Sequence, residues 1–372
     1  MLNVARRVGA ETRTVALPTG TLDLRVDAGS WTIDQLCGFA ARNNPKRGFL
    51  VVSRVLGRHL PTRPALMRRS ARDLAALVPA DLPGPVLVFG LAETAICLGQ
   101  TVHAELRALT GRDDIFFLHS TRQRIDHPLL CRFDEPHSHA SAHLVYQPAV
   151  PGFVQPRSLV LVDDEISTGR TLINLAEALT GAWDRIETIA ALSLTDWSDG
   201  AWLANMPRPS TRAALLEGQL TWTPSAQTAP CLSFETAAPA LGRLHPHRNF
   251  GRLGLRAPLA EPFPSCPPTT GPIRIIGTGE FTHPPFLLAE TLEQEGHDVI
   301  VQAVSRSPAR LGGAIATALR FADNYGTDVP NYLYNVDPAD GRANWFGFET
   351  GQGSIDPTLV DALDGQLLRW PA

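Results

Sequence analysis

The stretch that decides the fold is LVLVDDEISTGRT, at residues 159–171. Its first four residues are apolar, and such a continuous run suits a strand buried on both faces of a mainly parallel sheet. Two acids, Asp163 and Asp164, follow the run, and a small-residue turn then opens a helix predicted over 171–179. In open α/β sheets, ligands bind at the carboxyl ends of the strands. We therefore expect an α/β fold with a binding site at this turn.

The turn has the chemistry of a phosphate-binding loop. Backbone N–H groups at a helix N-terminus and the hydroxyls of Ser167, Thr168 and Thr171 can donate hydrogen bonds to a phosphate. The simpler alternative is an ordinary strand, turn and helix in which Ser167 or Thr168 is the N-cap. We favour a functional loop because its length, order and chemistry agree.

Other short apolar runs alternate with helical patterns, which is typical of α/β proteins. Further strands are predicted at 48–52, 85–89, 114–118, 143–146 and 187–194, and a further helix at 91–109. A stretch rich in Pro, Ala, Ser and Thr then separates these from a strand at 273–276, a helix at 285–295 and a strand at 298–304. We predict a domain at 1–223, a linker or extended segment at 224–271 and a smaller α/β domain at 272–372. No internal repeat is apparent.

Composition supports a folded chain of more than one domain. It has 372 residues, of which 44% are hydrophobic and 19% charged, and one core rarely organises so long a chain. A net charge of -4 and a pI near 6.3 give no basic field for nucleic acid or anionic membranes. No segment is apolar enough to cross a bilayer. Five widely spaced cysteines indicate reduced thiols, and we expect a cytoplasmic protein.

The stretch at 159–171 resembles the PRPP-binding motif of type I phosphoribosyltransferases, where PRPP is phosphoribosyl pyrophosphate. The resemblance implies that Asp163 and Asp164 bind the ribose hydroxyls, and it implies Mg²⁺, held mainly by substrate and water and in part by these two acids. Fixed carboxylates would also stabilise the cationic transition state at the sugar. In the family, the following loop holds the 5'-phosphate; the corresponding residues are Ser167, Thr168, Gly169, Arg170 and Thr171.

The order of motifs resembles orotate phosphoribosyltransferases. A loop after the strand at 85–89 matches the pyrophosphate-contacting loop of that branch, although a plain strand-to-helix turn is an equal alternative. Its residues are Gly90, Leu91, Ala92, Glu93 and Thr94. Residues 43–53 resemble the entry to the N-terminal hood. There, Lys46 (the only lysine) and Arg47 are candidates for pyrophosphate and Phe49 for the acceptor base; alternatively, the turn is solvated and Phe49 lies in the core.

Residues 120–142 correspond to a mobile basic loop in that branch. We predict a structureless lid that closes over the substrate and excludes water. Its candidate catalytic residues are Arg122, Arg124, His137 and His139. Closely spaced histidines and a carboxylate can also ligate zinc, so a metal site formed by Glu135, His137, His139 and His143 is the competing hypothesis, and simple loop polarity is a third.

The motifs together resemble a bacterial phosphoribosyltransferase branch found with tellurite-resistance-type stress operons, over roughly residues 20–225. Its members often carry a C-terminal domain named for a Thr-Arg-Ser-Pro motif, which here has the form SRSP at 305–308. The candidates in this domain are Arg306, Ser307 and Asn335, for a second substrate or an inter-domain contact. Arg306 and Ser307 could instead cap a helix that begins at Ala309.

The resemblance implies transfer of ribose-5-phosphate from PRPP to a base-like acceptor, with release of pyrophosphate, by a homodimer that binds neither nucleic acid nor membrane. Two alternatives stay open. One is a regulator that senses PRPP or a nucleotide on the same fold, and the other is the reverse reaction, which releases a base from a nucleotide.

Overall fold

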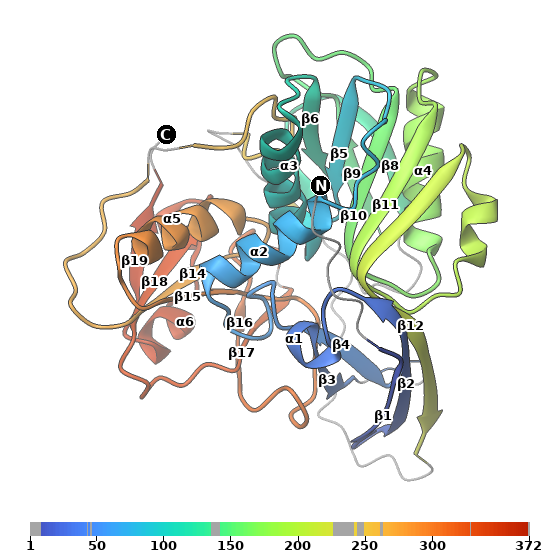
Figure 1. The fold of residues 1–372 in the computed structure, drawn as a ribbon. Helices are drawn as coiled ribbons and strands as arrows, with labels where there is room; N and C mark the ends of the chain where they lie inside the picture. Colours follow the sequence, from blue (N-terminus) through green and yellow to red (C-terminus); the bar gives the residue numbers. More distant parts are fainter. Residues whose placement is uncertain are drawn as a thin grey trace.

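The computed structural model describes residues 9–42, 44, 47–134, 142–225, 242–243, 249–260, 263–327 and 329–370. Two α/β regions lie side by side, each built on its own sheet (Figure 1). The first sheet has seven strands in the order β1-β2-β12-β11-β10-β5-β6, and the second has four in the order β15-β14-β18-β19. Among the described residues, no helix is long and apolar enough to cross a membrane.

The centre of the first sheet is parallel, as the apolar runs predicted. Strand β10 pairs in parallel with β5 and β11, and β5 with β6. The bounds are β5 Val86–Gly90, β6 Ile115–His119, β10 Ser158–Ile166, β11 Thr188–Asp196 and β12 Ser210–Pro224. The helices are α2 Pro64–Ala75, α3 Ala95–Thr110 and α4 Arg170–Ala182, with a short 3₁₀ turn η1 at Ala201–Asn205.

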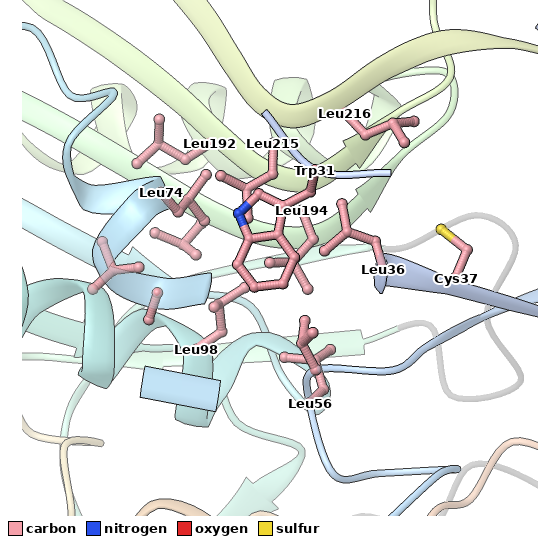
Figure 2. Packing of buried hydrophobic residues seen from close by; sticks show 14 of the residues in the cluster. Trp31, Leu36, Cys37, Leu56, Leu74, Leu98, Leu192, Leu194, Leu215 and Leu216 are labelled. Atoms are coloured by element: carbon pink, nitrogen blue, oxygen red, sulfur yellow. The ribbon is translucent and has the colours of Figure 1, made fainter. Parts of the chain in front are cut away.

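Helices cover both faces of this sheet because alternate strand residues point to opposite sides. Val160 and Val162 pack with apolar residues of α2 and α3, whereas Leu159 and Leu161 pack with α4. The first core also encloses Trp31, whose indole lies among leucines of several elements (Figure 2). The Trp31 Nε1–H donates to Asp73 at 2.9 Å, so the only polar atom of this ring has a partner.

Antiparallel strands extend the sheet beyond its parallel centre. Strands β1 (Glu11–Leu17) and β2 (Gly20–Gly29) form a hairpin, and β2 pairs with the long strand β12. A short helix α1 (Ile33–Leu36) leads into a second hairpin of β3 (Cys37–Ala41) and β4 (Phe49–Ser53). Strands β1 and β2 and helix α2 were not among the predicted elements, although in β2 the apolar Leu22, Leu24 and Val26 alternate with charged residues, a pattern that indicates a half-buried strand.

The second region has the same layered construction. Its parallel strands are β14 Ile273–Gly277, β15 Val299–Ala303, β18 Ala343–Phe348 and β19 Gln366–Arg369. Helix α5 (His283–Gln294) packs on one face of this sheet and α6 (Pro357–Ala362) on the other. A hairpin of β16 (Ala318–Ala322) and β17 (Pro330–Tyr334) lies between β15 and β18 in the chain, and a 3₁₀ turn η2 (Gln352–Ser354) precedes α6.

One expectation is wrong in this part of the chain. No helix begins at Ala309, since residues 309–317 form turns and an isolated bridge to Arg42. In the segment predicted as a linker or extended segment, residues 249–260 lie against both regions and Arg252 is buried. Arginine in a Pro-rich stretch gives no periodic signal, so its burial could not be foreseen.

Candidate active site

The acids of the central motif lie where strand β10 meets helix α4. The strand continues through them to Ile166, four residues beyond the predicted end, and Asp163 and Asp164 are partly exposed. The Asp164 backbone N–H donates to the Asp163 carboxylate at 2.9 Å. This contact fixes the orientation of the first acid relative to the second.

The loop after the acids is held open by a glycine rather than by a side-chain cap. Gly169 is the N-cap of α4 at φ 68°, so the alternative with Ser167 or Thr168 as N-cap is wrong. The Thr168 hydroxyl accepts only a long hydrogen bond, 3.5 Å, from the Arg170 N–H. A Cβ at residue 169 would lie 2.2 Å from the Trp202 ring. The position therefore requires glycine both for its positive φ and for the close approach of this ring. Ser167, Thr168 and Arg170 are exposed and Thr171 is partly exposed, and the first-turn N–H groups have no intrahelical acceptor.

The loop Gly90–Thr94 lies directly beside these acids. The Leu91 N–H donates to the Val162 carbonyl at 3.2 Å, and the Thr94 hydroxyl donates to the Asp164 carboxylate at 2.7 Å. The Ala92 N–H donates to the Ser120 hydroxyl at 3.0 Å, so that donor already has a partner. Two motifs about 70 residues apart in the chain are thus in direct contact.

Glu93 of this loop points toward the second region. Its side chain is 10% exposed and lies 3.3 Å from Arg58 Nη1 and 3.3 Å from the Arg306 Nε. Arg58 also donates to the backbone carbonyl of Glu93 at 3.2 Å. Arg58 could not be predicted from the sequence, because the segment that carries it has no motif.

The hood residues pack inward. Phe49 is 6% exposed and lies 5.4 Å from the Trp222 ring, with the Arg47 guanidinium 4.9 Å above it. Arg47 also forms an ion pair with Glu165. Burial raises the pKa of Glu165, and the Arg47 cation opposes that rise. These contacts favour the core alternative for Phe49, while Lys46 lies outside the described residues.

The segment after β6 is not a structureless lid where it is described. Strand β7 (Gln123–Arg124) pairs with β13 (Gly242–Arg243), and β8 (Leu129–Asp134) forms a hairpin with β9 (Ala142–Tyr146). Arg122 is only 6% exposed, and its Nη2 lies 3.2 Å from the His143 Nε2, whereas Arg124 is exposed. The prediction of a structureless lid is wrong for the described residues, because this stretch holds enough apolar residues to form paired strands. His137 and His139 lie outside the described residues.

The zinc hypothesis is untested for the same reason. His143 is buried, its Nδ1 lies 2.9 Å from the Ser120 hydroxyl, and its ring stacks on Phe133 at 4.6 Å. In the part of the chain that the structure describes, no three histidine, cysteine or acidic residues gather as metal ligands. Glu135, His137 and His139 are not among the residues described.

The three candidates of the second region have different surroundings. Arg306 reaches Glu93 and lies 3.4 Å from Asp323. Ser307 uses its backbone N–H to meet the Ser305 hydroxyl at 3.1 Å. Asn335, at φ 52°, donates to two backbone carbonyls at 2.9 Å and accepts a backbone N–H at 2.7 Å. Only Arg306 therefore approaches the candidate site.

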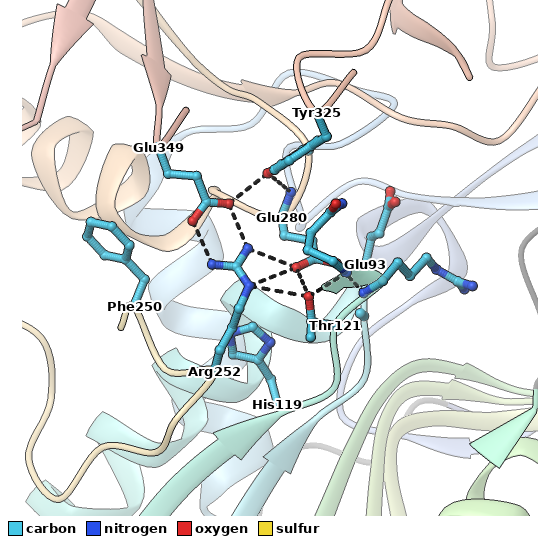
Figure 3. A network of polar contacts seen from close by, with 12 residues as sticks. Glu93, His119, Thr121, Phe250, Arg252, Glu280, Tyr325 and Glu349 are labelled. Atoms are coloured by element: carbon cyan, nitrogen blue, oxygen red, sulfur yellow. Dashed lines mark hydrogen bonds and ion pairs between the residues drawn. The ribbon is translucent and has the colours of Figure 1, made fainter. Parts of the chain in front are cut away.

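A buried ionic network joins the two regions, and sequence reasoning missed it (Figure 3). Arg252 is 2% exposed, and its guanidinium lies 2.8 Å from Glu280 and 2.6 Å from Glu349. The Thr121 hydroxyl donates to Glu280 at 2.5 Å, and the Tyr325 hydroxyl donates to Glu349 at 2.7 Å. The network begins two residues after β6 and therefore adjoins the Gly90–Thr94 loop.

The network shifts the titration of its members. Burial alone would raise the pKa of Glu280, but Arg252, His119 and the hydrogen bonds from Arg122 and Thr121 lower it to about 2. Burial lowers the pKa of His119 to about 4, and the charge of Arg252 acts in the same direction. Glu280 is therefore ionised and His119 neutral at pH 7.

Family models match the two regions separately. Residues 36–219 match the phosphoribosyl transferase model, and residues 263–362 match the TRSP domain, described as C-terminal to that transferase. The chain therefore carries a phosphoribosyltransferase region. More particularly, it combines that region with the TRSP domain, in the order that the second model describes. No curated protein matches the chain.

Among solved structures, adenine phosphoribosyltransferase from Rhodothermus marinus is 14% identical with a TM-score of 0.33, over 48% of this chain and 94% of that one. The Giardia lamblia enzyme complexed with 9-deazaadenine is 18% identical with a TM-score of 0.31, over 47% and 92%. UMP synthase from Leishmania donovani is 19% identical with a TM-score of 0.26, over 40% and 27%. The chain thus spans about a quarter of that synthase, and similarity this low establishes no substrate.

Proposed function

We propose that the chain transfers ribose-5-phosphate from PRPP to a base-like acceptor and releases pyrophosphate. The observation that carries this is the contact between Thr94 and Asp164, which joins the loop after β5 to the acids at the end of β10. The open turn at the start of α4 and the loop after β5, on either side of a carboxylate pair, suit a sugar with a phosphate at one end and a diphosphate at the other.

Each part of the site has a proposed role. The carboxylates of Asp163 and Asp164 accept hydrogen bonds from the ribose hydroxyls and stabilise positive charge at C1 as pyrophosphate leaves. The 5'-phosphate takes donors from the loop and first turn of α4, where Gly169 opens the entry. The loop at Gly90–Thr94 holds the leaving pyrophosphate, with help from the exposed Arg124 and from Lys46.

Magnesium fits this donor set as a shared ligand. Asp163 and Asp164 supply oxygen donors of the kind that Mg²⁺ prefers, but too few for an all-protein cage among the described residues. The two acids would therefore hold the ion together with substrate and water. When bound, the ion would neutralise charge that develops on pyrophosphate.

Calorimetry tests the proposal on the full chain with Mg²⁺ present. We expect saturable PRPP binding at or below millimolar concentration and pyrophosphate release when a suitable acceptor from a base panel is added. If neither PRPP nor a ribose-5-phosphate nucleotide binds, the proposal fails. Binding without pyrophosphate release for any base would favour the sensing regulator, and base release from a nucleotide would favour the reverse reaction.

Three further expectations belong to this proposal: a cytoplasmic enzyme, a homodimer and a site that does not bind nucleic acid. Sedimentation of the purified chain tests the second directly. A nucleic-acid titration at low salt tests the third, because electrostatic binding is strongest there.

A further inference from the structure

The second region repeats the topology of the first. Listed from the opposite edge, its sheet has the order β19-β18-β14-β15, which corresponds to β11-β10-β5-β6 in the first sheet. All of these strands are parallel in their pairs. Helix α5 connects β14 to β15 as α3 connects β5 to β6, and α6 follows β18 as α4 follows β10.

The connections also correspond. In each region an antiparallel hairpin separates the second strand from the third, formed by β8 and β9 in the first and by β16 and β17 in the second. An isolated antiparallel bridge ties the turn after the second strand to that hairpin, Thr121 to Leu144 in the first and Ser305 to Tyr332 in the second. Generic α/β folds do not require this detail.

Backbone hydrogen bonds fix the correspondence residue by residue. Gly90 ends β5, the next N–H donates to Val162, and the Gly90 carbonyl accepts from the Ser120 N–H. Gly277 ends β14 with the same pair of bonds: the Thr278 N–H donates to the Gly347 carbonyl at 3.2 Å, and the Gly277 carbonyl accepts from the Val304 N–H at 3.1 Å.

From these anchors the side chains can be matched by counting. Three residues after the glycine stands Glu93 in the first region and Glu280 in the second. Two residues after the third-strand anchor stands Asp164 in the first and Glu349 in the second. The position of Asp163 is taken by Phe348, and that of Arg122 by Arg306.

The second region lacks the features that open the first for a ligand. The Arg252 guanidinium lies between Glu280 and Glu349, the counterparts of Glu93 and Asp164. Phe348 supplies no carboxylate. Helix α6 is capped by the Asp356 side chain, which accepts from the Thr358 N–H. The second region thus has a short helix of six residues with a side-chain cap where the first has an open turn at Gly169.

The two regions exchange contacts at their matching acids. Glu280 of the second region accepts from the Thr121 hydroxyl and from the Arg122 N–H at 2.6 Å, both in the turn after β6. Glu93 of the first region is met by Arg306, in the turn after β15. Each turn thus contacts the acid of the other region, as in an association with approximate twofold symmetry.

We propose that residues 273–369 are a second copy of the transferase core that binds no PRPP and instead serves the first site through Arg306. This rests on the proposed function. Glu93 stands in the loop assigned to pyrophosphate, where a carboxylate would repel a diphosphate. Arg306 and Arg58 lie on the two oxygens of that carboxylate and offset its charge. Arg306 is therefore a positioning residue, held in place by Asp323.

Calorimetry on full-length variants tests the assignment, with PRPP, Mg-pyrophosphate and ribose-5-phosphate as probes. We expect one PRPP per chain in the unaltered protein. Arg306→Ala should weaken pyrophosphate binding about 10-fold or more, equivalent to ~1.4 kcal/mol, and leave ribose-5-phosphate within about twofold. Adding Glu93→Gln to that variant should restore pyrophosphate binding, because the repelling charge is gone. Arg320→Ala, an exposed change in β16, is the matched control and should alter neither.

Four results would overturn this assignment: two PRPP molecules per chain, equal weakening of both probes by Arg306→Ala, no recovery on adding Glu93→Gln, or an effect of Arg320→Ala as large as that of Arg306→Ala. Should Arg306→Ala not fold, Glu93→Gln alone decides, since it must bind pyrophosphate at least as tightly as the unaltered chain. If the unaltered chain binds no probe, the proposed function fails and this inference with it. If it binds PRPP but shows any of the four results, only the inference fails.

Discussion

The two copies of the core share a strand order but differ at the end of one strand. In the first, the C-terminal part of β10 carries the partly exposed Asp163 and Asp164, and a loop opened by Gly169 follows the strand. In the second, β18 ends in Phe348, and the acid that follows is paired with a buried arginine. The same backbone thus carries the proposed ligand site in one copy and a packing interface in the other. Function depends on a few side chains at the strand end rather than on the topology.

The largest expected effect is the loss of the buried ion pairs that join the second copy, here called the interface copy, to the rest of the chain. Arg252→Met leaves Glu280 and Glu349 as buried acids without their cation, which should cost about 3–5 kcal/mol of unfolding free energy. Denaturant unfolding measures the loss. The matched control is Arg157→Met, which removes an exposed ion pair with Glu187 and should leave stability unchanged. Equal stability of the two variants would show that the network does not hold the regions together.

The next largest effect is the loss of the two acids in the first copy, here called the ligand copy. Asp163→Asn with Asp164→Asn should lower turnover about 10²–10³-fold, because charges aimed at the sugar cation are lost, while the fold persists. Steady-state pyrophosphate release is the measurement. Glu349→Gln, at the position matching Asp164, should change stability but not turnover per folded molecule. If Glu349→Gln lowered turnover as much as the double variant, the copies would not differ in role as we propose.

A smaller effect sharpens the comparison at the two loops. Gly169→Ala forces a side chain into a left-handed conformation, at a cost of about 1–2 kcal/mol, and places its Cβ against Trp202. Ribose-5-phosphate binding should weaken as the loop shifts. Gly351→Ala, in the second copy, has φ -63° and no atom within 4 Å of the added carbon, so neither stability nor binding should change. Similar calorimetric affinities for the two variants would contradict the role of Gly169.

The smallest effect is a pH dependence from the interface copy. Because the pKa of Glu280 is lowered from 4.5 to about 2, its contribution to stability is present above pH 4.5 and is lost as the pH falls toward 2. The slope from one proton is at most about 1.4 kcal/mol per pH unit. Unfolding curves between pH 5 and 2 should be flatter in this window for Glu280→Gln. An unchanged slope of unfolding free energy against pH would mean that the pKa of Glu280 is not lowered in the folded state.

His119 adds a separate and earlier loss. Its pKa is lowered from 6.5 to about 4, so the folded state favours the neutral ring and stability begins to fall below pH 6.5. Since this part of the curve does not depend on the Glu280 proton alone, it should persist in Glu280→Gln and serve as the internal reference. Its disappearance would indicate that the two groups titrate as one unit.

The position of the central motif, where a strand meets a helix, was predictable from the sequence because its parts are local. An apolar strand, two acids and a glycine turn lie within 13 residues, and short-range pattern places them on one strand end. The neighbouring loop at Gly90–Thr94 was predictable from motif order. The hood aromatic was not settled in this way, since only packing on Trp222 decides that Phe49 is buried.

What the sequence by itself determined is therefore the α/β class, the parallel centre of the first sheet and the acids at the end of β10, since each is encoded in contiguous residues. Only the tertiary structure decided that Arg122 is buried, that Arg252 pairs with Glu280 and Glu349, and that Arg306 reaches Glu93. These contacts join residues far apart in the chain and depend on the relative placement of two sheets. The internal copy was hidden for the same reason, because strand order and backbone hydrogen bonds define it and only a few side chains match between the two regions.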